Sequence, residues 1–168
     1  MLKPQDIRAL CEKYAPEYKF DPLLIMAIVE QESSYDESEV RLENGFYRKY
    51  TRPLQYSTTT EILLAASYGL MQVMGESLKE LGFFSSWFEK QTTEAKAFLG
   101  NPLCEVAVPK AINAYMVHPE WQIEWGCQWL ARKRSIAQGD TWKMLLYWNG
   151  SPDYPQRVLE ILKKLSGK

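Results

Sequence analysis

The sequence has little histidine and little cysteine, and this scarcity limits the chemistry that it can support. Its 168 residues contain one histidine, His118. A Ser-His-Asp or Cys-His enzyme would have to use that residue, and a zinc site with several imidazole ligands cannot form. The three cysteines, Cys11, Cys104 and Cys127, stand far apart with no C-x-x-C pair. They favour reduced, mostly buried thiols over a disulfide framework. We therefore expect no metal site and no cofactor.

Charge of one sign and long apolar runs are also missing. Twenty Lys and Arg oppose twenty-one Asp and Glu, so a net charge of −1 offers no general attraction to nucleic acid or to an anionic membrane. The longest apolar run, residues 23–29, is much too short to span a bilayer. The first twenty residues carry charges throughout and lack the apolar segment of a signal peptide. We expect a monomer made in the cytoplasm, with no nucleic-acid partner and no membrane insertion.

What remains is an ordinary globular composition, with 46% hydrophobic and 24% charged residues. A chain of this length can remove about two-thirds of its unfolded surface from water, which is enough for a sizeable core. No internal repeat, low-complexity tract or Gly/Ser linker divides it. We predict one domain over residues 1–168.

Helical periodicity dominates the chain. Residues 4–14 place apolar side chains at i, i+3, i+4 and i+7, and Asp21-Pro22 supplies an N-cap and a first-turn proline to a second, nearly wholly apolar helix. Residues 34–60 are polar, contain the turn signal Asn44-Gly45, and are predicted as a long loop or small hairpin. Helical patterns continue at 61–82 (two short helices divided near Gly69), 92–100, 119–138, 141–148 and 155–165. These patterns predict an all-α fold of about six to eight helices.

Glu32 is the carboxylate with the most unusual surroundings. It ends the most apolar helix, and its neighbours at i−3, i−4 and i−7 are Val29, Ile28 and Ile25. Glu30 lies about 200° around the helix, so one of the two acids faces the apolar side. Apolar surface and the negative end of a helix dipole disfavour the anion, which raises the pKa and suits a general acid. The alternative is that Glu32 marks the point where the helix emerges into water.

No second acid is placed by spacing in the way that a standard two-carboxylate glycosidase requires. The nearest acids, Asp36, Glu37, Glu39 and Glu43, all follow the helix in a polar segment, where a solvated surface role is the default for each.

Several short motifs occur in an order that is more specific than any one of them. Glu32-Ser33 follows the apolar helix, Gly69-Leu70-Met71-Gln72-Val73 comes next, and Tyr147-Trp148-Asn149-Gly150 precedes Tyr154-Pro155-Gln156-Arg157-Val158. A segment beginning at Pro119 adds P-x-x-Q-I-x-x-G-x-x-W-L. With these motifs the sequence resembles the soluble-type lytic transglycosylases (SLT domain) over roughly residues 7–162. The resemblance implies a lysozyme-like fold.

The resemblance also implies an activity: cleavage of the β-1,4 bond between N-acetylmuramic acid and N-acetylglucosamine in peptidoglycan strands. Glu32 would be the sole catalytic acid. It would protonate the leaving oxygen and then deprotonate the muramyl 6-hydroxyl to give a 1,6-anhydro product. Assistance by the substrate's acetamido group would explain the missing second carboxylate. The implied substrate-binding residues are Ser33, Gly69, Met71, Gln72, Tyr147, Trp148, Asn149 and Tyr154, although Met71 is equally well interpreted as a core residue.

Some positions depart from the family pattern. Trp148 stands where Tyr is usual, Tyr147 where Ala is usual, and Gln122 replaces an Asn. The spacing from Glu32 to Gly69 is longer than in the simplest members, and the extra residues, 41–60, could wall the groove or form a surface flap. Together with the missing signal peptide, this resembles phage-encoded members, which would make the protein a bacteriolytic endolysin that reaches the cell wall during lysis or on a virion.

Three alternatives stay open. Trp121, Trp125 and Trp129 share one helical face, and we interpret them as core residues in preference to a sugar platform. A goose-type muramidase would use the same fold to hydrolyse with water, with Asp36 or Glu43 orienting the nucleophile. The domain could also be a catalytically silent wall-binding or virion structural module.

Overall fold

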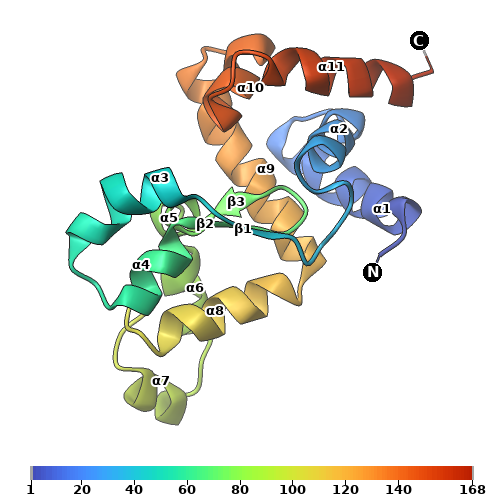
Figure 1. The fold of residues 1–168 in the computed structure, drawn as a ribbon. Coiled ribbons are helices and arrows are strands. Elements are labelled where there is room, and N and C mark those ends of the chain that lie inside the picture. The colour runs from blue at the N-terminus through green and yellow to red at the C-terminus, as the bar shows by residue number, and fades with distance from the viewer. Residues whose placement is uncertain (1, 168) are drawn as a thin grey trace.

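The computed structural model describes residues 2–167, and 69% of the chain is helical, which confirms the mainly α class (Figure 1). The α-helices are α1 (Pro4–Tyr14), α2 (Pro22–Ser33), α3 (Asn44–Phe46), α4 (Thr58–Leu64), α5 (Gly75–Glu80), α6 (Phe83–Glu89), α7 (Thr93–Leu99), α8 (Ala107–Met116), α9 (Pro119–Ile136), α10 (Thr141–Asn149) and α11 (Tyr154–Leu165). Two 3-10 turns, η1 (Ala15–Tyr18) and η3 (Arg52–Leu54), and a π-helical turn, η2 (Tyr47–Thr51), complete the helical structure among these residues.

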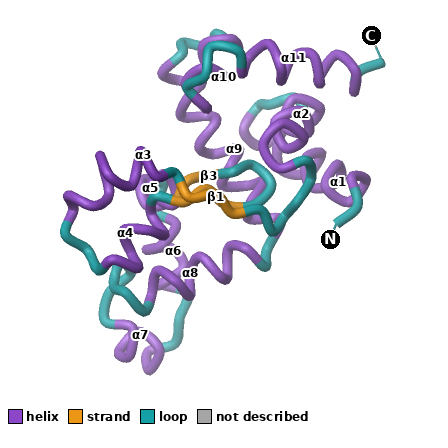
Figure 2. The backbone as a smooth tube through the Cα atoms, in the orientation of Figure 1, coloured by secondary structure: helices purple, strands orange, loops and turns teal. Residues whose placement is uncertain are grey.

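A small antiparallel sheet lies beside α9 (Figure 2). Its order is β1 (Val40–Leu42), β2 (Ala66–Tyr68) and β3 (Val73–Met74). Val40 pairs with Tyr68, and Ser67 pairs with Met74. The sheet therefore joins the segment just after α2 to a hairpin that lies about thirty residues further along the chain.

The longest helix, α9, connects two groups of elements. Figure 1 shows α1, α2, α10 and α11 on one side, and the sheet with α3 to α8 on the other. Helix α2 packs against α1 and α11, and its residues 24–29 are all buried. Helix α9 contacts α1 and α10 of the first group and α8 and β3 of the second, so it packs against both groups.

The predicted helix starts are confirmed where the N-cap signal is strong. Asp21 caps α2 by accepting a 2.9 Å hydrogen bond from the Leu23 amide, with Pro22 in the first turn. Thr92 and Asp140 cap α7 and α10 in the same way, and His118 is the N-cap residue of α9.

One prediction about the middle of the chain is wrong, and another is correct only in part. Residues 34–60 form neither a plain loop nor a local hairpin: they contain β1, which pairs with β2, and then α3, η2 and η3. The two short helices predicted within 61–82 are present as α4 and α5, but they are not adjacent, because α4 ends at Leu64 and the β2–β3 hairpin comes before α5 begins at Gly75. Every residue from 66 to 73 is buried, so the hairpin shows no alternation of apolar and polar residues.

The helix count also exceeds the predicted six to eight. Eleven α-helical segments occur among residues 2–167, because five of them have seven residues or fewer and give only weak periodic signals. No helix in that range is both long and apolar enough to cross a bilayer. The three cysteines are free thiols, of which Cys11 and Cys127 are buried.

Candidate active site

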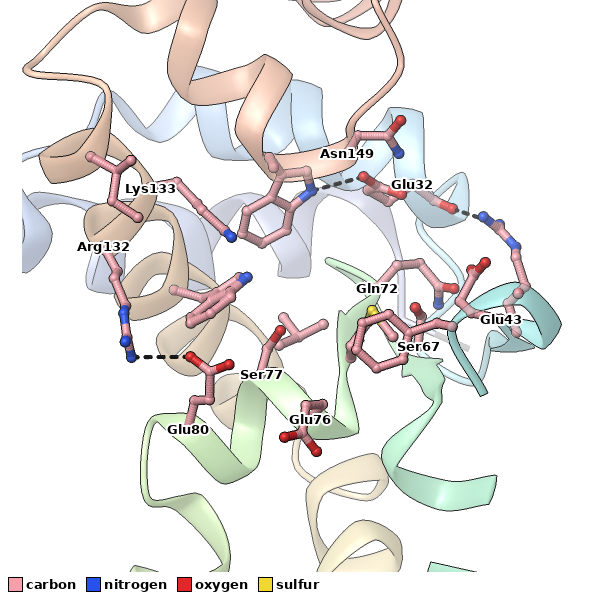
Figure 3. A pocket seen from close by; sticks show the side chains of 18 residues that line it. Glu32, Glu43, Ser67, Gln72, Glu76, Ser77, Glu80, Arg132, Lys133 and Asn149 are labelled. Carbon is pink, nitrogen blue, oxygen red and sulfur yellow. Dashed lines mark hydrogen bonds and ion pairs between the residues drawn. The ribbon is translucent and has the colours of Figure 1, made fainter. Parts of the chain in front are cut away.

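A groove of about 720 Å³ separates the two groups of elements (Figure 3). It is lined by Glu32 at the end of α2, by residues of the 41–46 segment, by β2, β3 and α5, and by side chains of α9 and α10. The groove thus brings together residues from the first and the last quarter of the chain.

Glu32 is a buried acid at this groove. Its residue surface is only 8% exposed, whereas Glu30 is partly exposed and accepts a 2.7 Å hydrogen bond from the Tyr35 hydroxyl. The predicted division between the two acids is therefore confirmed. The indole Nε1 of Trp148, on α10, donates a 2.8 Å hydrogen bond to Glu32 Oε1.

Burial raises the pKa of the Glu32 carboxyl above its ordinary value. Interactions with the Tyr154 hydroxyl, the Trp148 indole, the Arg41 guanidinium and the Asn149 amide each lower that pKa and offset part of the rise. The site thus combines an environment that favours the protonated acid with several groups that stabilise its anion.

Tyr154 and Asn149 both interact with the Glu32 carboxyl, but from different sides. Tyr154, the first residue of α11, is almost completely buried, and burial together with the nearby Glu32 raises the pKa of its hydroxyl. Tyr154 does not line the groove, whereas Asn149 does and is exposed. Asn149 is therefore positioned to meet a ligand, and Tyr154 to act on Glu32 from the side of the core.

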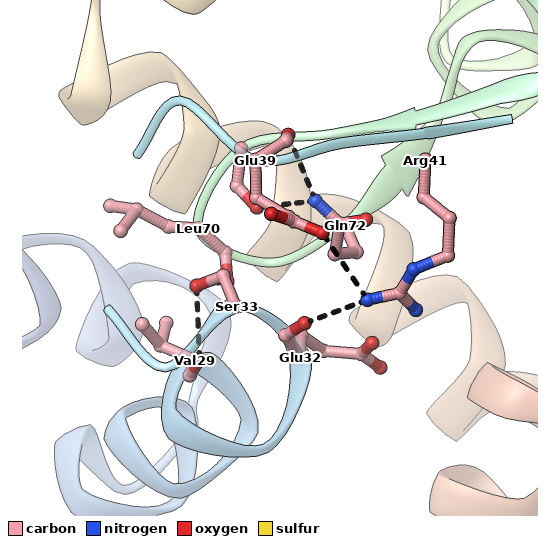
Figure 4. A network of polar contacts seen from close by, with 8 residues as sticks. Val29, Glu32, Ser33, Glu39, Arg41, Leu70 and Gln72 are labelled. Atoms are coloured by element: carbon pink, nitrogen blue, oxygen red, sulfur yellow. Dashed lines mark hydrogen bonds and ion pairs between the residues drawn. The ribbon is translucent and has the colours of Figure 1, made fainter. Parts of the chain in front are cut away.

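Ser33 connects the end of α2 to the segment carrying Gly69 to Gln72 (Figure 4). Its hydroxyl lies 3.0 Å from the Leu70 carbonyl and 3.2 Å from the Val29 carbonyl. The side chain is buried and does not line the groove. This contact positions the segment relative to Glu32.

Gln72 is the polar side chain of that segment that reaches the groove. Its amide nitrogen donates to the carbonyls of Glu39 and Gly69, both at 3.0 Å, and its Oε1 is buried without a hydrogen-bond partner in the structure. A buried acceptor of this kind needs a donor, because an unsatisfied polar atom costs about 1–3 kcal/mol. Gln72 thus places a polar side chain in the wall of the groove, although its unpartnered Oε1 is itself buried.

Gly69 and Met71 pack against residues of α9 and do not face the groove. Gly69 has φ +67°, and a Cβ there would overlap the side-chain amide of Gln122. Met71 is fully buried, and its sulfur fills the space that a Cβ on Gly126 would occupy. Neither residue lines the groove.

Gln122 holds the segment in place. Its Oε1 accepts a 2.8 Å hydrogen bond from the Leu70 amide, and its Nε2 donates to the carbonyls of Glu37 and Met116, both at 3.1 Å. Gln122, which departs from the family pattern, is therefore a fully buried residue whose three hydrogen bonds join distant segments of the chain.

The three tryptophans of α9 do not share one environment. Trp121 and Trp125 pack edge to face against Phe83, with centroid distances of 6.1 and 5.3 Å, as core residues do. Trp129 lines the groove, so the interpretation of all three as core residues is wrong for Trp129. Successive i+4 steps rotate by about 40°, which turns the last indole away from Phe83.

Of the neighbouring aromatic residues Tyr147 and Trp148, both predicted to bind substrate, only Trp148 lies at the groove. Trp148 lines the groove and contacts Glu32, whereas Tyr147 is 45% exposed and does not line the groove.

Sequence reasoning missed the groove cations Arg41, Arg132 and Lys133, whereas it had considered Glu43 and the 41–60 region as parts of the groove. From the 41–46 segment come Arg41, Glu43 and Phe46, so part of the inserted 41–60 region does wall the groove. Arg41 Nη2 donates to the Glu32 carbonyl at 3.4 Å and forms a 3.7 Å ion pair with Glu39. From α9 come Arg132 and Lys133. The sequence signal for these two cations is their position at i+3 and i+4 from Trp129, which places them on the same face of the helix as that groove residue.

Asp36 lies apart from these residues. Its Oδ1 accepts hydrogen bonds from the amide and the hydroxyl of Ser38, which lower the pKa of its carboxyl, and it does not line the groove. No cluster of three or more His, Cys, Asp or Glu side chains suitable for a metal ion occurs within residues 2–167.

A comparison with protein families decides what kind of domain this is. The family model of the transglycosylase SLT domain matches residues 9–98, more than half of the chain. The chain belongs to the transglycosylase SLT domain family. No curated protein and no solved structure gave a significant match.

The matched region of the SLT domain runs from α1 to α7 and contains Glu32, Ser33, Gly69, Met71 and Gln72. Trp148, Asn149 and Tyr154 lie beyond it and are assigned to the site by geometry alone. Membership supports a lytic transglycosylase type of function that acts on peptidoglycan.

Proposed function

We propose that this SLT domain is a monomeric peptidoglycan lytic transglycosylase in which Glu32 acts first as general acid and then as general base. The observation that supports this most directly is a buried carboxyl group with a raised pKa at the edge of a 720 Å³ groove. We place its site of action at the cell wall, and a phage-encoded endolysin is the role that matches the resemblance described above.

In the first step the protonated Glu32 carboxyl gives its proton to the glycosidic oxygen as the bond from that oxygen to the muramyl C1 breaks. The leaving N-acetylglucosamine departs with a free 4-hydroxyl, and the oxygen of the substrate's acetamido group bonds to C1 in its place. In the second step the Glu32 carboxylate takes the proton of the muramyl 6-hydroxyl while O6 bonds to C1 and the acetamido oxygen leaves C1. The acid regains its proton, the 1,6-anhydro ring closes, and no water is consumed.

The surroundings of Glu32 suit both steps. Burial favours the protonated form that the first step needs. The indole of Trp148 and the positive charge of Arg41 stabilise the anion that exists between the steps. Asn149, which is exposed at the groove, is the predicted polar residue best placed to position the acetamido and hydroxyl groups of the sugars, and the Gln72 side chain lines the same groove.

A goose-type muramidase is the second candidate, and one observation favours it. Glu43 lines the same groove as Glu32, whereas Asp36 does not (Figure 3). If hydrolysis occurs, Glu43 is therefore the acid that would orient the attacking water.

The test is mass spectrometry of purified peptidoglycan sacculi digested by the wild-type protein and by the Glu32→Gln and Glu43→Gln variants. We expect anhydro-muropeptides from the wild type and from Glu43→Gln, and no soluble products from Glu32→Gln. Reducing-end products that disappear in Glu43→Gln would establish the muramidase instead. If Glu32→Gln releases products as fast as the wild type, the catalytic assignment is wrong. If neither the wild type nor any variant releases products while sacculi are still bound, the domain is a silent wall-binding module.

A further inference from the structure

Among residues 2–167, three cationic side chains line the groove, and two of them already have partners. Arg41 contacts Glu39 and the Glu32 carbonyl, and Arg132 forms a 3.4 Å ion pair with Glu80. Among residues 2–167, no carboxylate lies within 4.0 Å of the ammonium group of Lys133. Lys133 is therefore the groove cation whose charge is left for a ligand.

The position of Lys133 fits this role. It lies on α9 one turn from Trp129, and its Nζ is 4.3 Å from the centroid of the Trp129 ring. Figure 3 shows the side chain extending from α9 into the groove, with Glu32 and Glu43 further along in the same view. The ring gives the ammonium one favourable contact and an apolar backing, but it supplies no negative charge.

The electrostatic surroundings leave this ammonium only partly stabilised. Burial lowers the pKa of Lys133, Glu80 nearby raises it, and the positive charge of Arg132 lowers it further. Because Arg132 takes the direct contact with Glu80, that carboxylate does not neutralise Lys133. A partly desolvated ammonium of this kind gains most from a ligand oxygen that carries negative charge.

We propose that Lys133 binds a carboxylate of the peptide stem carried by the glycan strand, and so makes the groove selective for strands that retain their stems. The inference rests on the proposed function, because it takes the glycan strand as the groove's ligand. The N-acetylated sugar rings are neutral when the lactyl group is in amide linkage to a stem. The carboxylates of such a strand therefore belong to the peptide.

The experiment measures binding without requiring cleavage. Calorimetric titrations use the Glu32→Gln protein and the same protein with Lys133→Gln. Two ligands come from one wall preparation: strands with intact stems, and strands from which an amidase has removed the stems and whose freed lactyl carboxylates have then been converted to neutral amides. We expect Lys133→Gln to weaken binding of stem-bearing strands about tenfold and to leave binding of stripped strands unchanged. Lys133→Arg should retain most of the affinity, and Lys163→Gln, on the exposed side of α11, should behave like the parent.

Two results would overturn the inference. Equal weakening for both ligands would show that Lys133 contacts sugars or supports the groove, and no weakening for either would show that it binds nothing on the strand. In both cases the proposed function would stand. If neither kind of strand binds the Glu32→Gln protein at all, the proposed function and the inference fall together.

Discussion

The indole of Trp148 and the carboxyl of Glu32 form a 2.8 Å hydrogen bond across 116 residues of sequence. This bond joins the last turn of α10 to the last turn of α2, so the acid is oriented by a helix that folds onto it from the far end of the chain. It also lowers the pKa of a carboxyl group that burial raises.

Replacing Trp148 by Phe should therefore raise the pKa of Glu32. The indole N–H stabilises the carboxylate, and its loss leaves burial less opposed. Because the acid must be protonated in the free enzyme, the alkaline limb of kcat/KM should move to higher pH. We also expect kcat to fall about tenfold as the carboxyl loses one orienting contact.

A pH series of sacculus digestion checks both effects. Trp142→Phe is the matched control, since Trp142 is 46% exposed and does not line the groove. An alkaline limb that stays in place, or moves to lower pH, would mean that the indole does not influence the ionisation of Glu32.

Glu32 should also reduce the stability of the protein at neutral pH. Its folded-state pKa is raised above the unfolded value, so the folded protein loses stability as the pH rises through that raised pKa. Glu32→Gln keeps an oxygen that can accept from Trp148 and removes the buried charge. We expect the variant to be more stable than the wild type by about 0.5–2 kcal/mol at pH 7, and the difference to vanish below about pH 4.

Urea unfolding at several pH values measures this difference. Glu12→Gln is the control, because Glu12 forms an exposed i,i+4 pair with Arg8 and should change stability by less than about 0.5 kcal/mol. If Glu32→Gln is less stable than the wild type at pH 7, the carboxylate is better solvated or paired than its burial indicates.

Ser33 provides a test of positioning. Ser33→Ala leaves the buried Leu70 carbonyl without its 3.0 Å contact, which should cost about 1–3 kcal/mol and loosen the segment that carries Gln72. Ser166→Ala removes a hydroxyl that bonds the Leu162 carbonyl at 2.7 Å on an exposed helix end, and should cost less than about 0.5 kcal/mol. Thermal unfolding compares the two, and sacculus digestion should be slowed only by Ser33→Ala. A loss of activity without a loss of stability would indicate instead that the hydroxyl acts directly on the substrate.

The acid could be predicted from sequence because its signals are local. The N-cap Asp21, the apolar run and the position of Glu32 at its end all lie within one helix, so periodicity alone gives the buried face. The groove could not be predicted in the same way. Glu43, Gln72 and Lys133 come from three separate elements, and their approach depends on how α9 and the sheet pack.

The β2–β3 hairpin is a second feature that local sequence patterns could not predict. Its residues 66–73 are all buried, so their apolar pattern could not be distinguished from that of a helix, and the turn depends on φ values of +67° at Gly69 and +47° at Gln72. The motif order nevertheless identified the family, because short functional motifs do not depend on the secondary structure assigned around them.

Gly69 and Gln122 give the sharpest test of how the Gln72 segment is held. Gly69→Ala would add a Cβ at φ +67° that overlaps the Gln122 amide, whereas Gly82→Ala adds one at φ +84° with nothing within 4 Å. The backbone cost, about 1–2 kcal/mol, is common to both variants. Gly69→Ala should lose a further 1–3 kcal/mol in urea unfolding, because the buried Gln122 side chain cannot move without breaking its bonds to Leu70, Glu37 and Met116. Digestion of sacculi should fall strongly only in Gly69→Ala, because a displaced backbone at residue 69 would also shift Gln72, which lines the groove. Equal losses of stability in the two variants would show that Gln122 yields to the new methyl group and does not fix the segment.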